Sequence, residues 1–380
     1  MDFTLTKEQQ DIQQAAREFA NGEFKEIGSE LDEKEKFPKD IWRKACELGF
    51  LGLFIPEKYE GAGLGFLEQT MIHEEFWRVD PGIGCLLLCT FGAEAVLMYG
   101  TEEQKKRYLP PLVKGEAITA TAITEPDAGS DVASIATTAI KSGEEYVING
   151  SKMFITHGDV ADYVVVLCVT DPEEKSYKKR FSMIMVETDT PGFEATKIEG
   201  KMGIRASDTA ELSFVDVKVP AKNLIGVEGQ GFYQVMEHFN RTRLYACGQG
   251  VGAAQGAFDM AVAHITQRKQ FGQTLSKFQG VQLRIAEMAS RIELGRNMYY
   301  KAAWLADNGK IDHKLVSIAK WYCGETGVRV TDEALQMHGG YGYIKEYNVE
   351  RFYRAAKVVE IYEGVKDIEK LIIAREILGR

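Results

Sequence analysis

The spacing of apolar and polar residues changes twice along the chain, near residue 120 and near residue 235. In 1–120 apolar residues recur with helical spacing, which is typical of helices that pack one face on a core. In 121–235 short runs of β-branched and aromatic residues alternate with Gly, Asp and Pro, a pattern that predicts strands and turns. In 236–380 helical spacing returns in long stretches with few prolines, as expected for a helical bundle.

Short sequence motifs predict where several helices and strands begin or end. Thr6 with Gln9 and Thr101 with Gln104 have the spacing of capping boxes, so each pair predicts a helix start. Strands are expected at 146–148, 163–169, 181–186 and 210–217, a turn at 149–150, and core helices at 248–265 and 281–307. The pattern predicts an α+β fold that is mainly α. Its parts are an N-terminal helical domain (1–120), a middle β-barrel-like domain (121–235) and a C-terminal four-helix bundle (236–380).

Charge and composition narrow the class of protein. The 380 residues carry a net charge of −10, with acidic and basic residues interspersed, so no basic face for nucleic acid or an acidic membrane is expected. The N-terminus resembles an amphipathic helix rather than a signal peptide. The longest apolar stretch, 83–89, is too short to span a bilayer. We therefore expect a cytoplasmic protein with no nucleic-acid partner and no membrane association.

The cysteines and histidines indicate no metal site. The six cysteines are sparse and lie in apolar surroundings, which favours buried free thiols in a reducing compartment. The six histidines lie far apart and never repeat at i, i+4, so we expect them at the surface or at helix ends.

Two motifs in the β segment carry small polar groups. ITEPDAGSD (123–131) provides hydroxyls and unhindered N–H groups that suit a flavin edge or a phosphate, although its Pro-Asp-Ala-Gly is also good turn chemistry. In KMFITHGD (152–159), Phe154 and Thr156 are expected on one face of a short strand, where a ring and a hydroxyl suit a flat cofactor. Taken alone, the second motif is better explained by an ordinary strand with a core phenylalanine.

Three motifs in the C-terminal segment pair aromatic, basic and glycine residues. In FNRTR (239–243), Phe239 and Arg243 lie one helical turn apart, which suits a nucleotide or a solvated helix end. In QRKQFG (267–272), Arg268 ends a helix and is available to a phosphate pair or to the helix terminus. QMHGGYGY (336–343) follows a helix, which excludes a Rossmann or Walker loop and leaves close backbone approach to a ligand or a simple helix end.

The most informative motif is IYEGVKD (361–367). Glu363 lies on a predicted tight turn next to apolar residues, where loss of water would raise the pKa of the carboxyl towards the range of a general base. A solvated glutamate is the alternative.

The order and spacing of these motifs make the chain resemble the acyl-CoA dehydrogenase family over essentially its whole length. ITEPDAGSD is similar to the family's first signature and QMHGGYGY, with the IKEY that follows, to its second. RKQFG and IYEG stand at the expected distances. The resemblance implies one FAD per subunit, an acyl-CoA substrate, an electron-transferring flavoprotein as acceptor and a homo-oligomer, usually a tetramer.

The resemblance also implies roles for particular residues. Glu363 would be the catalytic base, since the alternative position used by other branches, near Thr242, is not acidic here. The isoalloxazine end of FAD would contact Ile123, Thr124, Gly129, Ser130, Phe154 and Thr156. The pyrophosphate and adenosine half would contact Arg268, Gln270 and Phe271 of a neighbouring subunit, with Gln279, Gln336, Gly339 and Gly340 nearby. The acyl-CoA would contact Ser130, Phe239, Asn240, Arg243, Tyr362 and Gly364.

The function that follows is α,β-dehydrogenation: Glu363 takes the α-proton while flavin N5 accepts the β-hydride. A flavin monooxygenase or nitroalkane oxidase, or a non-catalytic scaffold on the same fold, are the alternatives. The presence of Glu363 and Arg243 disfavours the monooxygenase or oxidase. The hydroxyls of the β segment disfavour the non-catalytic scaffold.

The chain also departs from the family pattern. Phe154 replaces the usual tryptophan, Ala355 replaces an acid, and Val365-Lys366-Asp367 replaces Thr-Ser-Gln, which puts adenosine contacts there in doubt. The absence of arginine from 82–92 disfavours a glutaryl-type substrate and leaves short, branched or cyclic acyl groups open.

Overall fold

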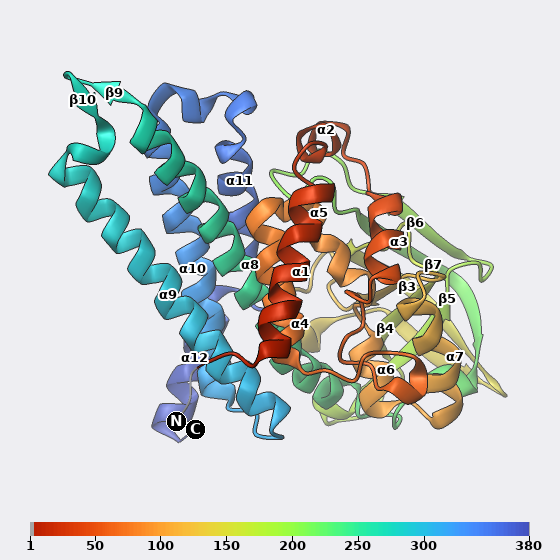
Figure 1. The fold of residues 1–380 in the computed structure, drawn as a ribbon. Coiled ribbons are helices and arrows are strands. Elements are labelled where there is room, and N and C mark those ends of the chain that lie inside the picture. Colours follow the sequence, from red (N-terminus) through yellow and green to blue (C-terminus); the bar gives the residue numbers. More distant parts are fainter. Residues whose placement is uncertain (1–3, 380) are drawn as a thin grey trace.

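The computed structural model describes residues 4–379, which form a helical N-terminal part, a sheet from the middle of the chain and a C-terminal group of long helices (Figure 1). This mainly helical α+β architecture is the one predicted from the sequence. The N-terminal helices are α1 (Lys7–Glu23), α2 (Gly28–Lys34), α3 (Lys39–Glu47), α4 (Phe66–Val79), α5 (Pro81–Gly84), α6 (Ala93–Tyr99) and α7 (Glu102–Val113).

The two predicted capping boxes are confirmed. The Thr6 hydroxyl accepts from the N–H of Gln9 at the start of α1, and the Thr101 hydroxyl accepts from the N–H of Gln104 at the start of α7. In each pair the glutamine side chain also accepts from the backbone N–H of its threonine, so two otherwise unpaired donors are satisfied.

The central part is one sheet of eight strands. Along the sheet the order is β6-β7-β3-β2-β4-β5-β8, and β1 pairs with β4 in parallel. The strands are β1 (Thr119–Ala122), β2 (Thr138–Ser142), β3 (Glu145–Thr156), β4 (Tyr163–Val169), β5 (Phe181–Glu187), β6 (Phe193–Lys197), β7 (Thr209–Pro220) and β8 (Leu224–Ile225). β4 and β5 pair antiparallel over their full length, and every residue of β4 after Tyr163 is buried.

The turn predicted at Asn149-Gly150 is wrong. β3 continues through these residues, and its pairing with β7 shifts between Ile148 and Gly150 as in a β-bulge. The side-chain oxygen of Asn149 accepts from the N–H of Asp216 at 2.8 Å, which ties the bulge to β7, while Gly150 takes a φ of 147°. The Asn-Gly pair thus serves a bulge inside a long strand instead of reversing the chain.

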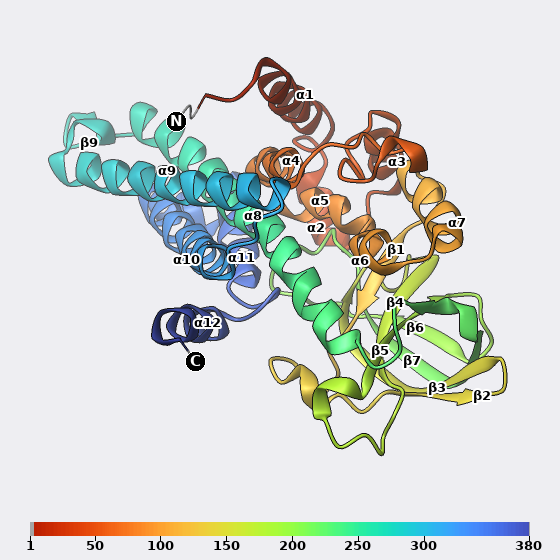
Figure 2. The same cartoon turned by 90° about the horizontal axis from the view of Figure 1, so that it is seen from below.

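The C-terminal helices are α8 (Gly231–Gln267), α9 (Gln279–Asp307), α10 (His313–His338), α11 (Val349–Val359) and α12 (Lys366–Leu378); the hairpin β9 (Lys269–Gln270) and β10 (Gln273–Thr274) joins α8 to α9. α8 begins well before the predicted position 248 and extends from the sheet into the bundle (Figure 2). Glycines let its backbone approach its neighbours: a Cβ on Gly250 would lie 2.6 Å from the carbonyl oxygen of Cys323 on α10. Because of this close packing, residues of α8, α10 and α12 can meet.

All six cysteines are free and buried, as expected from their apolar surroundings. Within residues 4–379, no helix has the length and apolar character that crossing a membrane requires.

A buried ion pair joins β3 to the segment that follows β1. The Nζ atom of Lys152 donates to the Glu125 carboxylate and to the carbonyl oxygen of Ile123, both at 2.9 Å. Lys152 is 0% exposed and Glu125 is 8% exposed, so neither charge can be solvated if its partner is removed.

We therefore expect Lys152→Met to lower the free energy of unfolding by about 3–5 kcal/mol, the usual cost of leaving one charge of a buried pair alone. The exposed Lys141→Met on β2 is the control and should change stability little. Denaturant melts would contradict the account if the two variants unfolded at the same midpoint.

Candidate active site

The centre of the site is the turn between α11 and α12. Glu363 has a φ of 55° and Gly364 a φ of 99°, so two consecutive residues are in the left-handed region. For a non-glycine residue this conformation costs on the order of 1–2 kcal/mol and persists only where the surroundings impose it. Here Nε of Arg243 donates to the carbonyl oxygen of Glu363 at 3.1 Å, and Nζ of Lys320 donates to the carbonyl oxygen of Gly364.

The Glu363 carboxylate points back towards α8. Its Oε2 atom accepts a hydrogen bond from the hydroxyl of Thr242, which is buried. Burial raises the pKa of Glu363, while Thr242, Arg243 and Lys320 act in the opposite direction. The side chain keeps part of its surface accessible, so it is poorly hydrated and yet reachable.

A second buried carboxyl, Glu94, lies at the start of α6. Its Oε1 accepts from the Tyr245 phenol at 3.0 Å and its Oε2 from the N–H of Gly92 at 3.1 Å. Burial raises the pKa of Glu94 to about 7, and the negative charge of Glu363 adds to this increase. Tyr245 is three residues beyond Thr242 on α8, so Glu94 and Glu363 are anchored to neighbouring positions of one helix face.

Further buried polar side chains continue the hydrogen-bonded group that contains Glu94 and Tyr245. The Tyr362 phenol donates to Oε1 of Gln249, and Nε2 of Gln249 lies 3.3 Å from Nδ1 of His73. The His73 ring stacks on Tyr245 at 4.9 Å between ring centroids. Burial lowers the pKa of His73 to about 3, so the ring is neutral at physiological pH.

The residues predicted to contact acyl-CoA lie in different parts of the site. Asn240 lines a cavity of about 590 Å³ together with Tyr233, Gln234 and Met236 on the same helix. Arg243 is directed inward: it is 6% exposed, its guanidinium carbon lies 5.9 Å from the Phe239 ring centroid, and it pairs with Glu369. Its contacts are with Glu363 and with Glu369 of α12, and its role in the acyl-CoA channel stays a prediction. Tyr362 and Gly364 flank Glu363, whereas Ser130 lies in the exposed part of the 123–131 loop.

Four of the six residues predicted to hold the flavin ring lie in β3 or beside it. Ile123 and Thr124 are tied to it, because Lys152 contacts the Ile123 carbonyl and the N–H of Met153 donates to the Thr124 carbonyl at 2.9 Å. The expected regular alternation of Phe154 and Thr156 is interrupted by a register shift between Lys152 and Ile155. The shift gives Phe154 a φ of 60° and leaves its ring 66% exposed. A Cβ added to Gly129 would meet no atom within 4 Å, so the backbone there is open to a ligand.

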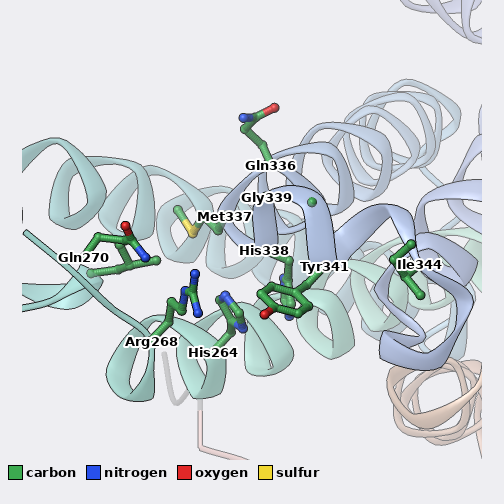
Figure 3. A pocket seen from close by; sticks show the side chains of 11 residues that line it. His264, Arg268, Gln270, Gln336, Met337, His338, Gly339, Tyr341 and Ile344 are labelled. Carbon is green, nitrogen blue, oxygen red and sulfur yellow. The ribbon is translucent and has the colours of Figure 1, made fainter.

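Five of the seven residues predicted to bind the nucleotide half of FAD line one cavity at the end of the bundle near the β9–β10 hairpin. A cavity of about 420 Å³ is lined by Arg268, Gln270, Gln336, Gly339 and Gly340, among others (Figure 3). The Arg268 guanidinium lies 5.3 Å from the Tyr341 ring centroid. The Gln336 side chain points away from Arg268 (Figure 3), and Gln279 and Phe271 lie outside the cavity, with Phe271 93% exposed.

Three of the six histidines differ from expectation, whereas His264, His313 and His338 lie near helix ends as predicted. His73, His157 and His238 are completely buried, and each ring packs against an aromatic side chain. Burial lowers their pKa values to about 3, 3 and 4, so the rings are held in the neutral form. Across residues 4–379, no group of three or more His, Cys, Asp or Glu side chains is arranged to hold a metal ion.

Sequence reasoning missed four buried residues of the site: Glu94, Tyr245, Lys320 and Glu369. Glu94, Tyr245 and Lys320 are polar residues within apolar or glycine-rich stretches, a signal that could have identified them. Glu369 has charged neighbours, Asp367 and Lys370, and carries no such signal.

Comparison with known proteins identifies the class of enzyme that combines a helical part, a sheet and a helical bundle with this desolvated carboxylate. The family models of the acyl-CoA dehydrogenase N-terminal, middle and C-terminal domains match residues 6–116, 120–217 and 229–378, respectively. The acryloyl-CoA reductase (NADH) of Anaerotignum propionicum is 43% identical over 100% of this chain and 97% of its own. The chain belongs to the acyl-CoA dehydrogenase family.

Solved structures agree. Butyryl-CoA dehydrogenase from Megasphaera elsdenii superposes with a TM-score of 0.96 at 38% identity, with both chains covered in full. A chain in the structure of the electron transferring flavoprotein of Acidaminococcus fermentans superposes with a TM-score of 0.97 at 40% identity, again over both full chains.

The family is FAD-dependent, and the residues present fit this cofactor. Phe154 and Phe271 expose aromatic rings that suit a flat ligand, and Arg268 provides a cation for a pyrophosphate. A Cβ on Gly339 or Gly340 would meet no atom within 4 Å, so a ligand can approach the backbone there. FAD is therefore the cofactor of this enzyme.

The buried Glu94 predicts a pH-dependent stability difference. Its pKa is higher in the folded protein, about 7, than the ordinary 4.5, so its contribution to stability is fully present below pH 4.5 and is lost as pH rises to about 7. As pH rises from 4.5 to about 7, we expect the free energy of unfolding of Glu94→Gln to increase by about 3 kcal/mol relative to that of the parent. Denaturant melts at several pH values measure this; a difference that does not change with pH would contradict it, and exposed Glu103→Gln is the control.

Proposed function

We propose that this protein oxidises a short acyl-CoA thioester to the enoyl-CoA, with Glu363 removing the α-proton. The observation that carries the proposal is the position of the Glu363 carboxylate, which is held by Thr242 at a left-handed turn and has a raised pKa. A carboxylate that is little stabilised by water is a stronger base, so it abstracts a weakly acidic proton more effectively.

The chain's own groups supply the other requirements. The backbone N–H of Glu363 is a donor for the thioester carbonyl, where it would stabilise the negative charge that develops as the α-proton leaves. The Arg243 and Lys320 contacts keep this N–H and the carboxylate in one fixed arrangement. FAD, when bound, supplies the hydride acceptor at flavin N5.

The buried side chains next to Thr242 support the proposal of a short acyl group. The Tyr245 ring is fixed by its hydrogen bond to Glu94 and by stacking on His73, and a ring fixed so close to Thr242 would limit the length of an acyl chain on this face of α8. The related protein from Megasphaera elsdenii is named a butyryl-CoA dehydrogenase, and the relative from Anaerotignum propionicum an acryloyl-CoA reductase. Electrons then pass to an electron-transferring flavoprotein, in keeping with the structural similarity to a chain of such an assembly.

Replacement of the base tests the mechanism. We expect Glu363→Gln to retain FAD and to bind substrate, but to slow flavin reduction by a factor of roughly a thousand or more, because no other group accepts the α-proton. Stopped-flow absorbance at the flavin band measures the rate. Glu376→Gln on the exposed face of α12 is the control and should reduce normally. Undiminished reduction by Glu363→Gln would refute the assignment.

A panel of thioesters tests the substrate class. Anaerobic mixing with butyryl-, octanoyl- and palmitoyl-CoA should bleach the flavin fastest with butyryl-CoA, because Tyr245 restricts longer chains. Faster bleaching by palmitoyl-CoA would contradict the short-chain assignment. A protein that binds FAD and is bleached by no thioester would favour the monooxygenase, and one that binds no FAD would favour a scaffold.

A further inference from the structure

A second carboxylate, Glu369, lies beneath the turn that carries Glu363. It belongs to the first turn of α12, is 0% exposed, and its Oε1 lies 3.0 Å from Nε of Arg243. A charge is buried at such cost only if it is compensated, and Arg243 supplies that compensation. The same Nε donates to the Glu363 carbonyl, so one guanidinium joins the two glutamates.

The turn rests directly on this pair. A Cβ on Gly364 would clash with Oε1 of Glu369 and would lie 3.3 Å from Nη2 of Arg243. From the other side, Lys320 of α10 donates to the Gly364 carbonyl. Three charged side chains from α8, α10 and α12 therefore surround the two residues that have positive φ.

The charges around Glu363 come from four elements. Arg243 on α8 and Lys320 on α10 are cations, whereas Glu94 on α6 and Glu369 on α12 are acids. The two cations alone would stabilise the Glu363 carboxylate and make it a weak base. The negative charge of Glu369 acts against them and favours a higher pKa for Glu363.

We propose that Glu369 is a positioning residue that, through Arg243 and opposite Lys320, holds the Glu363–Gly364 turn in its left-handed conformation and balances the charge beside the base. This proposal rests on the proposed role of Glu363. Glu369 contacts no reacting atom; it acts on the base only through the turn and through its charge.

The test compares the FAD-loaded enzyme with Glu369→Gln, which keeps the shape of the side chain and removes its charge. We expect FAD content and butyryl-CoA binding to be retained and flavin reduction to slow by roughly ten- to a hundredfold, the scale of a slightly misplaced catalytic group. The rate rises with pH as Glu363 loses its proton. The acid limb of this profile should therefore move to lower pH in Glu369→Gln, because a group that raises the pKa of Glu363 is gone.

Lys320→Met provides the opposite change. It removes a cation that lowers the pKa of Glu363, so the acid limb should move to higher pH. A purely structural role would not shift the two variants in opposite directions. Glu369→Asp restores the charge and should recover part of the rate, and Glu376→Gln on the same helix should match the parent.

The outcomes separate the two proposals. If Glu363→Gln reduces flavin normally, the base assignment is wrong, and the role of Glu369 falls with it. If Glu363→Gln is inactive while Glu369→Gln and Lys320→Met keep the parent rate and profile, the base stands and the positioning proposal is overturned. Should Glu369→Gln fail to fold, the Lys320→Met profile alone decides: a shift to higher pH supports the charge balance, and no shift overturns it.

Discussion

The site depends on a carboxylate that is kept from water and is still open to a substrate. These demands conflict, because a desolvated carboxylate tends to take up a proton or turn towards solvent. At Glu363 the conflict is resolved by the backbone: a left-handed turn directs the side chain to Thr242, and cations on two helices hold the turn by its carbonyl oxygens. Contacts with the helices of the bundle therefore stabilise the strained conformation of the turn.

The rest of the fold can be understood as support for this arrangement. α8 carries Thr242, Arg243 and Tyr245 within two turns, and its glycines let α10 approach closely enough for Lys320 to reach the turn. The sheet contributes from the other side, where the Lys152–Glu125 pair fixes the strand bearing Phe154. Helices position the proton acceptor, and the sheet presents an exposed aromatic surface that suits the cofactor.

The sequence predicted the order of helices and sheet because periodicity and capping are local properties, as Thr6 with Gln9 illustrates. It misjudged Asn149-Gly150, since a bulge and a turn use the same residue types and only the pairing with β7 distinguishes them. Local chemistry singled out Arg268 and the two glycines of one cavity but left a simple helix end open for each, whereas Gln270 and Gln336 were named only through the family resemblance. The inward direction of Arg243 and the roles of Glu94, Lys320 and Glu369 depend on contacts between distant helices, which no local pattern reports.

Proton removal from the α-carbon, observed apart from hydride transfer, tests the central claim most directly. An acyl-CoA analogue with sulfur in place of the β-carbon cannot give up a hydride, yet its α-hydrogens can still exchange. In deuterated buffer, NMR should show the parent enzyme replacing these α-hydrogens with deuterium, and Glu363→Gln leaving them in place. Equal exchange by both proteins would show that another group removes the proton.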